Sequence, residues 1–176
     1  IAKNGSKYDF AVLDEDEQQE QQPQNLYLSA KTTKKNGKVC PQVIGQASKK
    51  KFCEYFNITL SELDYIKKYI EENVVKLLGI YTNTTFDCPI IYYNQHKNTL
   101  QLIKLIKPIE WKDYKIQFSH ILKNKKWNES TSLSVASNTS IGEFQIHNHR
   151  DCIKFRWCFE KLLECFKCHF DVIILH

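Results

Sequence analysis

The sequence of 176 residues contains no methionine and two arginines, and its first residue is Ile1. We therefore expect a chain that is a fragment or lacks residues before Ile1, so features missing near its start carry no weight. No apolar run approaches the roughly 20 residues of a membrane-spanning helix, and no secretory signal is visible. No glycine-rich phosphate loop is present, which argues against a nucleotide-driven motor.

Cysteine is present in an odd number, seven, scattered through apolar stretches. This pattern predicts reduced thiols in a reducing, cytoplasmic compartment and no disulfide framework. The string from Cys165 to His169 spells C-x-x-C-H, the haem-attachment motif, but haem attachment needs export. A zinc site built from Cys165, Cys168, His169 and Cys158 would lack a second C-x-x-C pair. Structural thiols are the expected role, and a zinc-stapled interaction protein is kept as the weaker alternative.

Hydrophobic residues make up 42% and charged residues 26% of the chain, which predicts one globular domain over residues 1–176 with no membrane association. The net charge of +5 is unevenly spread: residues 31–51 hold seven lysines and no acid, whereas residues 14–20 are acidic. A basic stripe is typical of a polyanion partner, because displaced counterions drive the binding. A solvated surface in a lysine-rich chain explains the stripe equally well.

Alternation of apolar and polar residues over 8–13 and 26–33 predicts a hairpin around a polar tip. Ser48 is placed to cap a helix over residues 49–56. A capping box from Thr59 to Glu62 and apolar residues at helical spacing predict a helix over 60–78 that ends at Gly79.

The rest of the chain is predicted as short strands and turns over 86–128, a polar loop over 128–140, two strands within 142–157 and a closing helix over 159–170. Strands and helices mixed in this way predict an α/β fold with a mixed central sheet flanked by helices.

Asp9 and Lys31 fall on the two strands of the predicted hairpin, where they can converge at one end of the sheet. The period of two places Ser29 and Lys31 on the same face. The Asp9 carboxylate and the Ala30 main-chain carbonyl offer hard oxygens for Mg²⁺ or Mn²⁺, and Lys31 can orient a water and offset phosphate charge. The pattern favours metal-assisted phosphodiester hydrolysis. Alternatively, Asp9 is a surface acid paired with Lys7 or Lys31.

The spacing D-x(19)-S-x-K resembles the signature of the PD-(D/E)XK nucleases. The order of GSKYDF, LSAK, a Lys/Asn/Gly turn and the basic aromatic helix KKKFCEYF is similar to that in type II restriction endonucleases, above all the small enzymes that recognise four base pairs. The resemblance covers residues 5–57 and 128–157. It implies a restriction-endonuclease-like fold and sequence-specific cleavage of double-stranded DNA, with Asp9, Ser29 and Lys31 as catalytic residues.

One position departs from this pattern, because Ser29 stands where many relatives carry an acid. A strong metal ligand is therefore missing, and Asp14, Asp16 or a carboxylate before Ile1 would have to compensate. Without compensation the site binds metal weakly or is inactive. The first alternative is thus a non-catalytic nucleic-acid-binding module on the same fold.

The residues predicted to contact DNA form two groups. The first group follows the catalytic hairpin and consists of Lys34, Lys35, Gln42, Gln46, Lys49 and Lys50. The second lies within a recognition loop and hairpin over 128–157 and consists of Gln145, His147, Arg150, Lys154 and Arg156. Glutamine can pair with adenine, and arginine or lysine with guanine. A solvated hairpin face, and turn hydrogen bonding by Gln42 and Gln46, explain the same pattern. Both a monomer and a homodimer fit the sequence.

Overall fold

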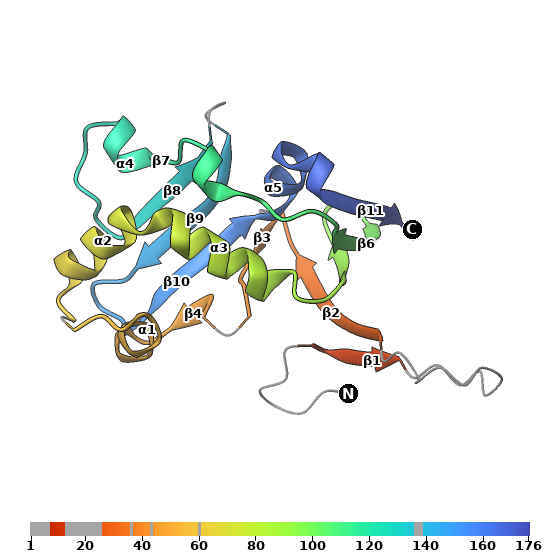
Figure 1. Cartoon of the computed structure of the whole chain (residues 1–176), viewed down its shortest axis with the longest axis horizontal. Coiled ribbons are helices and arrows are strands. Elements are labelled where there is room, and N and C mark those ends of the chain that lie inside the picture. Colours follow the sequence, from red (N-terminus) through yellow and green to blue (C-terminus); the bar gives the residue numbers. More distant parts are fainter. Residues whose placement is uncertain (1–7, 13–25, 36, 43, 60, 136–138) are drawn as a thin grey trace.

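The computed structural model describes residues 8–12, 26–35, 37–42, 44–59, 61–135 and 139–176 (Figure 1). The predicted mixed α/β class is confirmed. The described strands form two sheets that lie next to each other rather than one central sheet. The polar tip of the predicted first hairpin lies outside the described residues.

The first sheet carries the predicted catalytic hairpin. Its spatial order is β1 (Phe10–Val12), β2 (Leu26–Thr33), β5 (Ile90–Asn94), β6 (Thr99–Leu105) and β11 (Phe170–Ile174). Strands β1 and β2 are antiparallel with Phe10 opposite Leu28, so the predicted hairpin is confirmed. Strands β2 and β5 run parallel, which makes the sheet mixed. The long connection that parallel strands require contains three helices and the start of the second sheet.

The second sheet is antiparallel in all its described pairs. Its order is β3 (Lys38–Val39), β10 (Ile153–Cys158), β9 (Ser140–Ile146), β8 (Ser130–Ser134) and β7 (Gln117–Phe118), with β4 (Gln46–Ala47) also paired to β10. The two strands predicted within 142–157 are confirmed as β9 and β10. The predicted loop over 128–140 is wrong for β8. In this polar strand Ser130 and Ser132 are more exposed and alternate with buried Thr131 and Leu133. Pairing with β7 and β9 satisfies the backbone hydrogen-bonding groups that a loop would leave to water.

Two helices, α2 (Leu63–Glu72) and α3 (Val74–Thr85), replace the single predicted helix over 60–78. Asn73 breaks the helix with φ −114° and ψ 17°. The capping box does not form, because Glu62 is the N-cap and makes no side-chain capping hydrogen bond. Gly79 lies inside α3. Burial of Leu77, Leu78 and Tyr81 against the sheet outweighs the roughly 1 kcal/mol that a helical glycine costs.

The remaining helices are α1 (Lys49–Phe56), α4 (Ser119–Leu122) and α5 (Phe159–Cys165). Helix α1 begins as predicted, since the Ser48 hydroxyl accepts a hydrogen bond from the Lys51 N–H at 3.2 Å. The predicted closing helix ends early at Cys165, and the chain returns as β11. None of the helices in the described ranges has the length and apolar character needed to cross a bilayer. All seven cysteines are free thiols.

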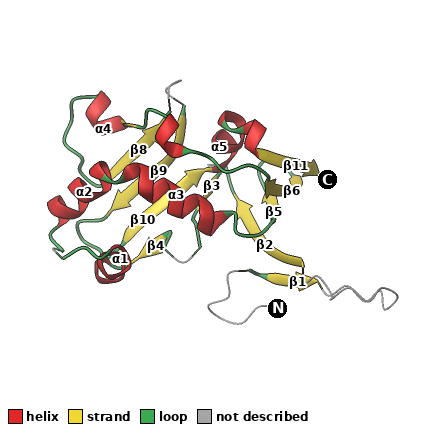
Figure 2. Cartoon of the chain, viewed as in Figure 1, coloured by secondary structure: helices red, strands yellow, loops and turns green. Residues whose placement is uncertain are grey.

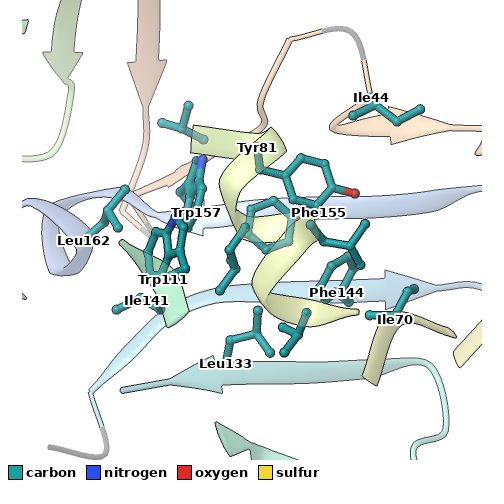
Figure 3. Close-up of a cluster of buried hydrophobic side chains, with 14 of the residues drawn as sticks. Ile44, Ile70, Tyr81, Trp111, Leu133, Ile141, Phe144, Phe155, Trp157 and Leu162 are labelled. Atoms are coloured by element: carbon teal, nitrogen blue, oxygen red, sulfur yellow. The ribbon is translucent and has the colours of Figure 1, made fainter. Parts of the chain in front are cut away.

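Helix α3 lies across one face of the second sheet (Figures 1 and 2), and the core is packed between them. Tyr81 stacks on Phe155 with ring centroids 4.3 Å apart, beside Phe144 and Trp157 (Figure 3). Trp157 Nε1 donates to Thr85 Oγ1 at 2.9 Å. Phe159 contacts Tyr92 of β5, with centroids 4.8 Å apart. The core therefore extends into the first sheet, and the position of β2 relative to β10 is fixed by packing.

Candidate functional site

The Asp9 carboxylate lies at the end of the first hairpin, one residue before β1. Its Oδ2 accepts a hydrogen bond from the Ser29 hydroxyl at 3.0 Å and from the Ala30 N–H at 2.7 Å. Lys31 Nζ lies 4.0 Å from the same oxygen. The Asp9 N–H donates to the Leu28 carbonyl at 2.8 Å, which holds the residue against β2. The structure thus brings together the three residues that the sequence pattern singled out.

The alternation of β2 explains which groups reach this site. Ser29 and Lys31 point to one face, Ser29 fully buried and the Lys31 side chain 16% exposed. The N–H and C=O of one strand residue point to the same edge. Since the Ala30 N–H meets Asp9, the Ala30 carbonyl faces the edge where the Asp9 side chain, 45% exposed, opens to solvent.

Gln42 reaches the site from the connection between β3 and β4. Its Nε2 donates to the Ser29 hydroxyl at 2.7 Å, whereas its Oε1 is buried without a hydrogen-bond partner in the part of the chain that the structure describes. The turn behind it is tight, since a Cβ on Gly45 would lie 2.2 Å from the Pro41 carbonyl oxygen. The sequence assigned Gln42 to DNA contact. No spacing rule indicates its contact with Ser29, which depends on how the two sheets meet.

Cys88, just before β5, is a second neighbour that sequence reasoning missed. Burial, reinforced by the charge and hydrogen bond of Asp87, raises the pKa of the Cys88 thiol to about 11. Lys31 and Asp9 are near enough to act on this thiol electrostatically. At neutral pH it is therefore protonated and a poor nucleophile or metal ligand.

The donor set at Asp9 fits a hydrated Mg²⁺ or Mn²⁺. Magnesium is usually held by one or two carboxylates, several waters and substrate phosphates. The site offers Asp9 Oδ1, which has no hydrogen-bond partner among the described residues, and the Ala30 carbonyl. Within the described ranges no three His, Cys, Asp or Glu side chains group as metal ligands. Asp14 and Asp16, which could compensate for Ser29, lie outside those ranges.

The predicted zinc ligands gain no support from their surroundings. Cys165 and Cys168 are exposed. The His169 ring places Nδ1 at 3.1 Å from the Lys107 carbonyl and 3.0 Å from the Pro108 carbonyl. These contacts give His169 a structural role in joining the C-terminal turn to the segment after β6.

Three predicted DNA contacts form one row across the second sheet. The register pairs Gln46 of β4 with Lys154 of β10, and Lys154 with Gln145 of β9. Their neighbours Ile146, Ile153 and Phe155 are buried, so the row lies on the face turned away from the core. The sequence alone could not show that Gln46 joins the other two residues.

Arg156 lies one step further along this face, but its guanidinium is held by a carboxylate. Its Nε donates to Glu143 Oε1 at 2.8 Å, its Nη2 contacts the same oxygen, and Lys38 pairs with Oε2. Burial alone would raise the pKa of Glu143, but the hydrogen bonds from Lys38 and Arg156 outweigh it and hold that pKa below its usual value. To read a base, Arg156 would have to leave Glu143.

The other predicted contacts are spread over the surface. Lys34 and Lys35 are exposed after β2, and Arg150 is exposed in the turn between β9 and β10. The Lys49 N–H donates to Asp151 Oδ1 at 2.8 Å, which ties this turn to the start of α1. Lys50 Nζ lies 3.9 Å from Glu54, and His147 Nδ1 lies 3.8 Å from Glu129. Lys49, Lys50 and the turn that carries Arg150 therefore lie together, whereas Lys34 and Lys35 follow β2.

The chain is similar to the type II restriction enzyme CviAII of Paramecium bursaria Chlorella virus 1. The two are 48% identical over 176 residues, which make up 99% of this chain and 48% of that enzyme. The chain thus spans about half the length of this curated relative. No protein-family model matches the chain, and no solved structure matches it.

Proposed function

We propose that this chain carries the catalytic core of a type II restriction endonuclease, which cleaves double-stranded DNA at a specific site with Mg²⁺ or Mn²⁺. The observation that carries this proposal is the convergence of Asp9 and Lys31 on one hairpin, with 4.0 Å between Oδ2 and Nζ. The similarity to CviAII supports the substrate class. The hairpin supports the reaction type, because it places a carboxylate that can hold a metal ion beside an ammonium group that can act on a phosphate.

Different residues of the site would act on the metal ion and on the phosphate. Asp9 and the Ala30 carbonyl would hold the metal ion, which when bound would supply Lewis-acid charge stabilisation and an activated water. The Lys31 ammonium orients the attacking water and offsets the charge that develops on the phosphate. Ser29 is buried and faces Asp9, so its contribution is to the carboxylate rather than to the DNA.

The outer face of the second sheet supplies the contacts to DNA. The row of Gln46, Lys154 and Gln145 presents amide and ammonium groups that match base edges in the major groove. The lysines that follow the hairpin, Lys34, Lys35, Lys49 and Lys50, would contact phosphates and add affinity without sequence information. His147 and Arg150 complete the proposed interface, and Arg156 would join it only by leaving Glu143. Binding as a monomer and as a homodimer are both compatible with this arrangement.

A non-catalytic DNA-binding module is the second candidate. It is favoured by the serine at position 29, where the nuclease signature has an acid, and by the finding that no three His, Cys, Asp or Glu side chains group as metal ligands within the described residues. This candidate predicts binding to DNA without cleavage. It also predicts that changes at Asp9 and Lys31 leave the DNA affinity nearly unchanged.

A plasmid-cleavage assay with Mg²⁺ separates the two candidates. We expect Asp9→Ala to abolish cleavage and Lys31→Ala to lower the cleavage rate by about 10²- to 10³-fold, the typical effect of removing one electrostatic contact to a transition state. Asp64→Ala and Lys76→Ala are matched controls, because both residues are exposed on helices α2 and α3. Cleavage that persists in Asp9→Ala would refute the catalytic assignment, and binding without cleavage by every version would favour the module.

A further inference from the structure

We propose that Gln42 is a positioning residue for Asp9, acting through the hydroxyl of Ser29. This inference rests on the proposed metal-dependent nuclease function and goes beyond it. It assigns to Gln42 and Ser29 together the orientation of the Asp9 carboxylate. The supporting observation is a chain of two hydrogen bonds, from Gln42 Nε2 to Ser29 Oγ at 2.7 Å and from Ser29 Oγ to Asp9 Oδ2 at 3.0 Å.

The direction of these bonds follows from the chemistry of the three groups. An amide NH₂ can only donate, and an ionised carboxylate can only accept. A serine hydroxyl has one proton and can donate it to one partner at a time. Since Gln42 donates to the Ser29 oxygen, the Ser29 proton is left to point at Asp9. Reversing the amide would draw this proton to Gln42 Oε1 and leave Asp9 without it.

The orientation of Asp9 depends on this proton. Oδ2 receives the Ser29 hydroxyl and the Ala30 N–H, one on a side chain and one on the backbone. Two donors on one oxygen fix the rotation of the carboxylate group. Fixing Oδ2 also fixes the position of Oδ1, the oxygen that would hold the metal ion. Carboxylates that bind a metal ion are commonly held by such hydrogen bonds, and losing a partner of this kind weakens metal binding.

The half-buried Gln42 side chain is held against Ser29 by one end of its amide group. Its Nε2 donates to Ser29 Oγ, whereas its Oε1 is buried and lacks a hydrogen-bond partner among the described residues. The turn that carries Gln42 leaves no room for a side chain at Gly45, because a Cβ there would lie 2.2 Å from the Pro41 carbonyl oxygen. The amide is thus kept against Ser29 despite the unsatisfied oxygen.

The test uses Mn²⁺ affinity of the purified protein without DNA, measured by electron paramagnetic resonance, beside the dependence of DNA cleavage on Mg²⁺ concentration. We expect Gln42→Leu to raise the Mn²⁺ dissociation constant about ten- to a hundredfold, the usual effect of losing a partner of a metal ligand. Gln42→Met, which has a similar length and cannot donate, should do the same and provides a second variant if the first is unstable. Gln95→Leu is the matched control, because Gln95 is an exposed glutamine in the turn after β5.

A double-mutant cycle shows whether Gln42 acts through Ser29. If it does, Ser29→Ala weakens Mn²⁺ binding and adding Gln42→Leu causes no further loss, because residues of one hydrogen-bond chain are not additive. Ser29→Thr, which keeps the hydroxyl, should retain most of the affinity. Wild-type affinity in both Gln42 variants, or additive effects in the cycle, would overturn the positioning role while leaving the nuclease proposal intact. A wild-type protein that neither binds Mn²⁺ nor cuts DNA would overturn both.

Discussion

Replacing Arg156 should damage the stability of the fold, whereas replacing Lys154 should damage DNA binding. The two residues lie on the same face of β10, two positions apart. Arg156 donates to the buried Glu143 carboxylate through two nitrogens. Lys154 lies in the row with Gln46 and Gln145 and has no ion-pair partner among the described residues. Arg156→Met and Lys154→Met are therefore a matched pair.

The expected magnitude follows from the surroundings of Glu143. Hydrogen bonds to a charged group contribute about 1.5–3 kcal/mol, and leaving a buried charge unpaired costs about 3–5 kcal/mol. Lys38 still pairs with the carboxylate after the change, and the Arg156 side chain is 27% exposed to solvent. The remaining Lys38 pair and the solvent exposure of Arg156 both reduce the expected loss of stability. We expect Arg156→Met to lower the free energy of unfolding by about 2 kcal/mol, which for a chain of this size lowers Tm by about 4–8 °C.

Urea unfolding and binding to specific and non-specific DNA check this prediction. Lys154→Met should change the free energy of unfolding by no more than about 0.5 kcal/mol and should weaken binding to the specific site by about 1–3 kcal/mol while it relaxes site preference. The reasoning is refuted if Arg156→Met leaves the urea midpoint unchanged while it removes site preference. That result would show that Arg156 leaves Glu143 to contact a base.

Two further predictions concern buried polar groups. Because the pKa of Glu143 is lower in the folded protein than its ordinary value of 4.5, its stabilising contribution is present above pH 4.5 and is lost as the pH falls through the folded pKa. Glu143→Gln should therefore be less stable than the wild type at pH 7, and the difference should shrink as the pH falls below 4.5. Thermal melts across pH measure this, and a difference in Tm that stays constant with pH would contradict it. The Tyr81 hydroxyl is buried without a hydrogen-bond partner among the described residues, so Tyr81→Phe should leave the protein as stable or stabilise it by about 1 kcal/mol, and a clear loss in urea unfolding would reveal a partner for that hydroxyl.

Local pattern in the sequence was sufficient for the elements that depend on near neighbours. Alternation over residues 8–13 and 26–33 predicted the first hairpin, and the same period over 142–157 predicted β9 and β10 with Phe144 and Phe155 buried. The D-x(19)-S-x-K spacing singled out Asp9, Ser29 and Lys31 through its resemblance to a nuclease signature, and the period of two along a strand predicted that Ser29 and Lys31 share one face. Side-chain direction along a strand is a property of the strand itself.

Tertiary structure decided the features that join distant segments. The polar strand β8 and the break at Asn73 depend on what packs beside them, and the local composition favoured a loop and one continuous helix instead. Gln42 meets Ser29, and Arg156 meets Glu143 and Lys38, because the second sheet packs beside the first through a shared aromatic core. These contacts form because the apolar faces of different elements pack against each other. The periodicity of one segment shows which of its faces is apolar, but it does not show which other segment packs on that face.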